Sequence, residues 1–202
     1  MSRESRISPL ALAVLGLLAG GPLHPYRMER LLREWGKDQV IRIGQRANLY
    51  TAIKRLHAAG AISVRQTERD QQYPQRTVYE ITGEGRDLLL GRLAEMVSTP
   101  RNEFPEFPAA LSFLMLLGPD GAALNLEKRA DQLRATVAET DEALERLSAQ
   151  VPRVVLLEVE YQRAVAAAEL QWVDTVLDDL RTGALTWDHT DFSGAADAYR
   201  QN

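Results

Sequence analysis

The stretch from residue 46 to residue 60 constrains the fold most, because a short amphipathic helix there leads directly into a strand. Gly60 suits the positive φ angle that ends a helix, and residues 61–64 then alternate in the manner of a strand. A helix that runs into a hairpin in this way predicts a winged helix-turn-helix. The apolar residues that recur at helical spacing and predict its buried face are Leu49, Ala52, Ile53 and Leu56.

The other face of this predicted helix gathers cations, an amide, a hydroxyl and a phenol, which are the groups that meet phosphates and base edges in DNA. An ordinary amphipathic helix with a solvated basic face is the alternative. The candidate DNA-binding residues of the helix are Arg46, Asn48, Tyr50, Thr51, Lys54 and Arg55.

The helix is followed by two segments of period-two alternation, residues 62–67 and 76–81, which predict a hairpin. We expect Ile62 and Val64 on one face, with Val78 or its neighbours opposite. The polar loop between the strands predicts a wing that follows a phosphate backbone or enters a minor groove, and a solvated hairpin loop is the alternative. The candidate DNA-binding residues of the hairpin are Arg65, Arg69 and Arg76.

The net charge of −4 hides an uneven distribution along the 202 residues. Residues 1–92 hold 15 basic and 9 acidic residues, whereas residues 93–202 hold 9 basic and 19 acidic ones. Because phosphate repels acidic side chains, we expect only the front half to touch DNA.

Catalytic and metal chemistry find little support in the sequence. There is no cysteine, which excludes a disulfide framework, a thiolate metal site and a nucleophilic thiol. We expect His24 to cap a helix and His57 to pack or meet solvent, and no glycine-rich phosphate loop follows a strand. The tail residues Asp188, His189 and Asp191 are interpreted as solvated rather than as a metal site. We therefore expect no enzyme, no cofactor and no metal.

The first residues are too polar for a signal peptide, and the apolar segment 10–18 is too short to span a bilayer. We therefore expect a cytoplasmic protein. Ser8-Pro9 predicts the start of a first helix that ends near Ala19, and a second helix is predicted from Tyr26 to Trp35.

Three prolines between residues 99 and 108 predict a linker between two domains. The expected division is a winged helix-turn-helix domain at 1–98, the linker at 99–108, a helical domain at 109–185 and a tail at 186–202. The helical domain should begin with a short, buried apolar helix at 109–117. The expected fold class is mostly α with a small β-hairpin wing, followed by coiled-coil-like helices for dimerisation.

Several motifs of the front half together resemble the PadR family of bacterial transcriptional regulators. The resemblance covers about residues 8–97 and implies a winged-helix DNA-binding domain, a helical dimerisation domain and repression relieved by a small molecule. The family usually starts its recognition helix with proline, where this chain has Arg46-Ala47-Asn48. The motifs are Leu-Ala-Val-Leu-Gly-Leu-Leu at 12–18, His24-Pro25-Tyr26, Leu49-Tyr50, Lys54-Arg55-Leu56, Gly60-Ala61-Ile62, Tyr79-Glu80-Ile81-Thr82 and Gly85.

The rear half carries two seams of apolar residues in alternating steps of three and four, one from Leu126 to Val151 and one from Leu156 to Leu180, with Arg163 as the misfit. Two such helices predict an antiparallel hairpin. The later helix has a second apolar stripe that includes Val165 and Trp172, and we expect this surplus face to dock on a second copy, giving a homodimer. Docking on the 109–117 helix is the alternative. The residues assigned to the dimer interface are Leu156, Val159, Ala166, Leu170, Val173, Leu177 and Leu180.

The expected mechanism is a dimer that places two recognition helices on a palindromic operator, with an effector that changes their spacing. Trp35, Tyr161 and Trp172 are the candidates to line a site for an aromatic or apolar effector, and plain interface packing is the alternative for each. A winged-helix interaction module without DNA binding, and a constitutive DNA-binding protein without an effector, are the competing functions.

Overall fold

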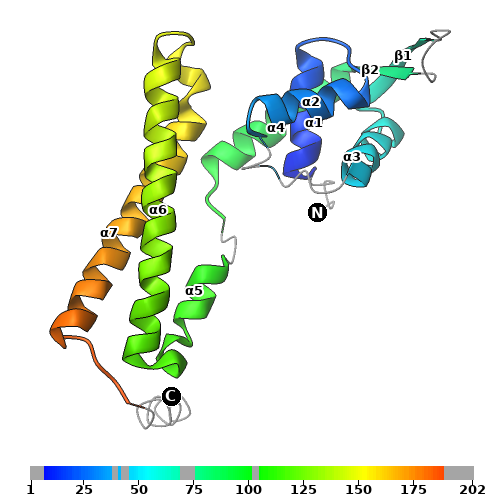
Figure 1. Ribbon diagram of the computed structural model, residues 1–202. Helices are drawn as coiled ribbons and strands as arrows, with labels where there is room; N and C mark the ends of the chain where they lie inside the picture. The colour runs from blue at the N-terminus through cyan, green and yellow to red at the C-terminus, as the bar shows by residue number, and fades with distance from the viewer. Residues whose placement is uncertain (1–6, 38–40, 42–45, 69–75, 102–104, 189–202) are drawn as a thin grey trace. The chain divides into compact units, whose positions relative to one another are not determined.

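The computed structural model describes residues 7–37, 41, 46–68, 76–101 and 105–188 of the chain. The chain folds into two compact units, residues 1–102 and residues 103–202. The first unit holds helices and a two-stranded hairpin, and the second holds helices (Figure 1). The predicted fold class, mostly helical with a hairpin wing, is confirmed. Among the helices that the structure describes, none is both long and apolar enough to cross a membrane.

The first helix is the centre of the N-terminal unit, as its uniformly apolar sequence predicts. Ser8 caps it, since its Oγ accepts a hydrogen bond from the amide of Ala11 at 3.2 Å, and Pro9 stands at the first turn where no amide is needed. Val14 and Leu15 are fully buried. The elements of the unit are α1 (Pro9–Ala19), α2 (Pro25–Glu34), α3 (Arg46–Ala58), β1 (Ile62–Glu68), β2 (Arg76–Ile81) and α4 (Gly83–Ser98).

One apolar core joins α1, α2, α3 and the start of β1. Met28 of α2, Leu49 and Ile53 of α3 and Ile62 of β1 are buried in it together with α1. Helix α1 packs against α3, α4 and β2, so α3 and the hairpin share one support.

The hairpin differs from the predicted alternation at one point. β1 and β2 pair antiparallel with Val64 opposite Tyr79 and Gln66 opposite Val78, so Arg65 is the extra residue of a β-bulge. Ile62 and Val64 precede the bulge and lie on one face of β1, where Ile62 is buried and Val64 is 43% exposed, and the alternation shifts only after Val64.

The C-terminal unit begins with two short helical pieces instead of the predicted buried helix at 109–117. α5 (Glu106–Leu111) begins earlier, right after Pro105, and a separate 3₁₀ turn, η2 (Leu114–Leu117), follows. Neither piece has a buried residue, and Leu116 is exposed. Ser112 is the C-cap of α5, and its hydroxyl donates a hydrogen bond to the carbonyl of Pro108 at 3.2 Å.

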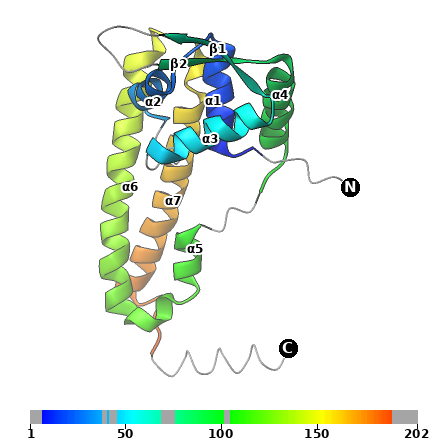
Figure 2. The same ribbon diagram turned by 90° about the vertical axis from the view of Figure 1, so that its right-hand side faces the viewer.

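The rest of this unit is an antiparallel helical hairpin of α6 (Gly118–Ser148) and α7 (Leu157–Thr182), joined through the 3₁₀ turn η3 (Arg153–Val155). The two helices lie side by side along their length (Figure 2). Leu126 and Ala130 of α6 are buried against Val173 and Leu177 of α7, as the two seams predict.

This packing shows how the residues assigned to the dimer interface lie within a single chain. Of the assigned residues, Leu156, Ala166, Val173 and Leu177 are buried within the single chain, and Leu170 and Leu180 pack on the same core. The surface that remains open on α7 is the surplus stripe, in which Val165 and Trp172 are exposed.

Candidate nucleic-acid interface

Helix α3 has one buried and one open face, and the division follows its sequence. Leu49, Ile53 and Leu56 are buried in the core. Tyr50 is 43% exposed, and the side chains of Asn48, Thr51, Lys54 and Arg55 are exposed as well. The hydroxyl of Thr51 donates a hydrogen bond to the carbonyl of Ala47 at 2.8 Å. Neither Lys54 nor Arg55 has an ion pair with any residue that the structure describes, so both charges are available to a ligand.

The C-terminal end of α3 is fixed by its backbone. Gly60 adopts φ 73°, its amide donates to the carbonyl of His57, and the amide of Ala61 donates to the carbonyl of Leu56, both at 3.0 Å. This pair of bonds stops the helix and turns the chain into β1. The hydroxyl of Thr82 donates to the carbonyl of Gly60 at 2.7 Å and accepts from the amide of Gly85 at 3.0 Å, so it also caps α4.

Glycine is required at position 85 because α4 starts against this turn. A Cβ added to Gly85 would lie 1.9 Å from the carbonyl oxygen of Ala61. The same carbonyl accepts the amide of Thr82 at 3.1 Å. The end of α3, the start of β1 and the start of α4 thus meet in a tightly packed corner.

The hairpin is joined to α2 as well as to α3. Leu23, just before α2, pairs with Tyr79 of β2 through two backbone hydrogen bonds of 3.0 and 2.9 Å. On the other side, the ring of His57 meets the ring of Tyr79 edge-on at 6.1 Å. Because Tyr79 contacts both neighbours, the start of α2, the end of α3 and the hairpin keep fixed relative positions.

A basic groove results between the start of α2 and the hairpin. It has a volume of about 470 Å³, and its lining includes His24, Arg27, Arg65 and Gln66. Nδ1 of His24 accepts the amide of Arg27 at 3.1 Å, which confirms the expected helix cap. Arg65 lies 3.7 Å from Glu80, and both side chains are partly exposed, so this ion pair is loose. Arg27 has no ion pair with a described residue.

The predicted DNA-binding residues are thus described in part. The exposed side chains of α3 and of Arg65 belong to the same unit, and Arg65 and Arg27 both line the basic groove. The sequence marks Arg27 only as an outward cation of its helix, and its place beside the hairpin depends on the distant pairing of Leu23 with Tyr79. Arg69 and the side chains of Arg46 and Arg76 lie outside the described residues.

The candidate effector residues fall in both units. Trp35 lines a pocket of the N-terminal unit, whereas Tyr161 and Trp172 lie exposed on α7. Trp172 also meets the ring of Phe107 edge-on at 6.0 Å, so α5 covers part of it. The described residues include no group of three or more side chains able to hold a metal ion, and His189 and Asp191 lie outside them.

Comparison with known proteins gives a consistent set of similarities. Residues 14–90 match the family model of the transcriptional regulator PadR-like family. The fold is similar to Bacillus subtilis PadR in complex with operator DNA, at 20% identity and a TM-score of 0.69 over 85% of this chain and 97% of that one.

Two further solved structures share the fold. The structure of Bacillus subtilis PadR in complex with p-coumaric acid matches at 20% identity and a TM-score of 0.70, over 85% of this chain and 98% of that one. A PadR-like transcriptional regulator from Bacillus cereus matches at 18% identity and a TM-score of 0.60, over 86% and 99% of the two chains. Among curated proteins, no sequence match was found.

Proposed function

We propose that the chain is a PadR-like transcriptional regulator, as its match over residues 14–90 supports, and that it is a ligand-responsive repressor that binds a palindromic operator as a homodimer. It is a regulator and not an enzyme. We further propose that it acts in the cytoplasm. The observation that supports DNA binding most is the open face of α3, where Lys54 and Arg55 extend from a helix whose other face is buried.

In this proposal α3 enters the major groove, and the amide of Asn48 and the phenol of Tyr50 meet base edges there. Lys54, Arg55 and the cations of the hairpin hold phosphates. The basic groove adds Arg27, which would hold the backbone between the recognition helix and the wing. The acidic composition of residues 93–202 keeps the second unit off the DNA.

The homodimer is proposed to form through the exposed stripe of α7, defined by Tyr161, Val165, Ala168 and Trp172. These residues recur in steps of four, three and four, so they lie on one side of the helix. Two copies joined this way would present two α3 helices to successive major grooves, roughly 34 Å apart. The fold's similarity to Bacillus subtilis PadR, solved with operator DNA and with p-coumaric acid, supports a DNA target and a small-molecule effector.

A mobility-shift titration tests the proposal, with the DNA upstream of the protein's own gene at two salt concentrations. We expect a saturable shift that unlabelled specific DNA removes and that salt weakens steeply. Lys54→Ala and Arg55→Ala should each cost about 1–3 kcal/mol of binding free energy. Lys128→Ala, which removes an exposed cation of α6, is the matched control and should leave binding unchanged.

If both α3 variants bind like the control, the assignment of α3 as the recognition helix is wrong. If neither the upstream DNA nor any sequence selected from random DNA binds, the winged unit is a protein-interaction module. A shift that no small molecule relieves would leave a constitutive DNA-binding protein.

A further inference from the structure

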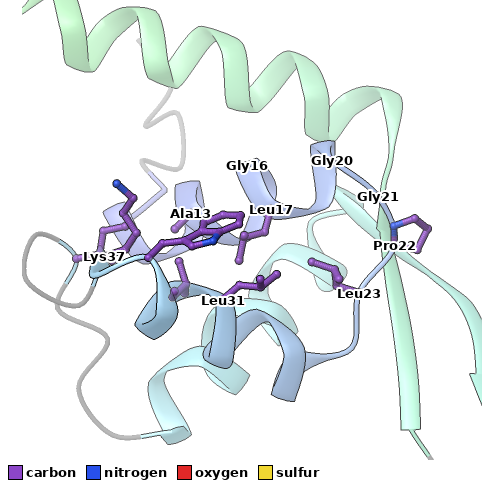
Figure 3. Close-up of a pocket in the computed structure, with 12 residues that line it drawn as sticks. Ala13, Gly16, Leu17, Gly20, Gly21, Pro22, Leu23, Leu31 and Lys37 are labelled. Atoms are coloured by element: carbon purple, nitrogen blue, oxygen red, sulfur yellow. The ribbon is translucent and has the colours of Figure 1, made fainter. Parts of the chain in front are cut away.

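Apolar surface stays open in both units of the chain. In the N-terminal unit, Leu17 and Leu31 point into a hollow of about 530 Å³ beside α1 (Figure 3). In the C-terminal unit, apolar side chains lie open around η2, where α6 begins. The second surface differs from the first because the described chain returns to it just before residue 189, so the residues that follow can reach it.

The open surface around η2 is formed by side chains that this turn directs outward. Phe113 is 59% exposed and Leu116 is 56% exposed. Leu114 between them packs on the core of α6 and α7, so the surface has a firm support. Neighbouring exposed apolar side chains of this kind usually mark a place where another segment or molecule binds. We call this surface the base patch and define it by Phe113, Leu116 and Leu117.

The chain comes back to the base patch after α7. Gly183 ends that helix with φ 77°. The indole Nε1 of Trp187 then donates a hydrogen bond of 2.8 Å to the carbonyl of Met115, the residue that precedes Leu116 in η2. The described chain stops one residue later, at Asp188, and so it ends beside the base patch.

Residues 189–202, which we call the C-terminal segment, carry an apolar stripe in their sequence. Its members stand at positions i, i+3, i+4 and i+7, which is the spacing of one face of a helix. Asp191, directly before the first of them, is a residue type that caps helix N-termini. Because helices this short are marginal in water by themselves, the stripe favours a helix only where an apolar surface covers it. The stripe consists of Phe192, Ala195, Ala196 and Tyr199.

The short connection limits which surface the stripe can meet. Phe192 is four residues beyond Asp188, so it can lie at most about 14 Å from it. The base patch is within that reach, whereas η3 is not, because α6 spans 31 residues, or roughly 45 Å, between the two ends of the hairpin. A tether this short gives an effective concentration in the millimolar range. The segment of the same chain is therefore favoured over that of a second copy at micromolar protein concentration.

We propose that the C-terminal segment folds back as a short amphipathic helix on the base patch of its own chain, with Phe192 and Tyr199 facing the patch. The segment then closes the base of the C-terminal unit and withdraws its apolar surface from other molecules. This inference concerns the second unit alone and is independent of the proposed DNA binding.

The reactivity of a single thiol measures how well the patch is covered. Because the chain has no cysteine, Leu116→Cys introduces the only thiol, and its rate of reaction with dithionitrobenzoate reports how open the patch is. Adding Phe192→Asp should undock the segment and raise this rate roughly tenfold. Ser193→Asp adds the same charge off the stripe and should leave the rate unchanged. Val154→Cys, at an exposed position of η3, is the control thiol and should react at the same rate whichever segment is present.

Cross-linking then tests whether the segment belongs to the same chain. In the full-length Leu116→Cys/Phe192→Cys variant, treated with the short linker bismaleimidoethane at micromolar protein concentration, we expect a product with the mass of one chain. The matched variant Val154→Cys/Phe192→Cys should give no such product, because Phe192 cannot reach the other end of the hairpin.

Equal thiol reactivity of Leu116→Cys with the natural segment, with Phe192→Asp and with Ser193→Asp would overturn the proposal, because the segment would then leave the patch uncovered. A cross-linked product with the mass of two chains would assign the patch to the segment of a second copy and would overturn the folding back within one chain. Equal cross-linking of Phe192→Cys to Leu116→Cys and to Val154→Cys would also contradict the proposal.

Discussion

Arg163 of α7 donates two hydrogen bonds to the carboxylate of Asp141 on α6, through Nε to Oδ1 and through Nη2 to Oδ2 at 3.2 Å. Arg163 is the residue that breaks the apolar seam of α7, and this pair explains how the seam accepts it. The two-pronged geometry fixes the position of one helix along the other. Arg134 makes a similar contact across the same two helices, to Asp174 at 2.6 Å.

The Arg163–Asp141 pair predicts a pH dependence of stability. The hydrogen bonds from Arg163 hold the pKa of the Asp141 carboxyl below its usual value. A lowered folded-state pKa contributes stability that is complete above the pKa of an unfolded aspartate, about 4, and is lost as the pH falls through the lowered value.

We therefore expect thermal unfolding, followed by circular dichroism from neutral pH to about pH 2.5, to lose less stability in Asp141→Asn than in the wild type. Glu142→Gln, which changes an exposed neighbour, is the control and should follow the wild type. If Asp141→Asn and the wild type lose stability in parallel, the pair does not stabilise the hairpin.

The corner at Gly85 predicts a large loss of stability from a single methyl group. Gly85→Ala places a Cβ against the carbonyl of Ala61, and we expect the free energy of unfolding of the winged unit to fall by about 1–3 kcal/mol. Gly83→Ala, two residues earlier in α4, meets no atom within 4 Å and is the matched control. Chemical denaturation of both variants measures this loss. Equal denaturation midpoints would show that the corner accommodates the added methyl group without loss of stability.

The basic groove predicts a phosphate contact by Arg27. Arg27→Ala should weaken binding to specific and nonspecific DNA alike and lower the slope of log affinity against log salt by about 1. Arg30→Ala is the control on the same helix, because Arg30 pairs with Glu34 at 3.2 Å. A variant that loses affinity only for the specific site would show that Arg27 reads bases instead of phosphate.

If two copies dimerise through the exposed stripe of α7, a charge placed on that stripe should separate them without unfolding the α6–α7 hairpin. Val165→Asp puts a charge on an open position, and we expect the dimer dissociation constant to rise on the order of a hundredfold with helix content unchanged. Gln171→Asp, exposed but off the stripe, should leave the dimer intact. Light scattering coupled to size exclusion measures both.

Val173→Asp should instead affect the folding of the hairpin. Its side chain is fully buried against α6, so an aspartate there should unfold the hairpin before it separates two copies. A Val165→Asp variant that stays dimeric would place the interface on another surface.

The local sequence by itself determined much of the N-terminal unit. The spacing of Leu49, Ile53 and Leu56 sets the buried face of α3, because helical periodicity fixes which residues share a side. Gly60 ends that helix, and Thr82 caps the next, because only their own backbone geometry and short-range hydrogen bonds are involved. The PadR resemblance, read from motifs of the same segments, is confirmed by the match over residues 14–90.

Only the tertiary structure decided the features that join distant segments. The bulge at Arg65 shifts the pairing of the strands beyond Val64, since strand register depends on both partners and not on one strand's alternation. The pairing of Leu23 with Tyr79 brings Arg27 to the hairpin. Periodicity likewise shows that α7 has two apolar faces, but the packing of Val173 and Leu177 on α6 determines which face stays open, because either face has the composition to be buried.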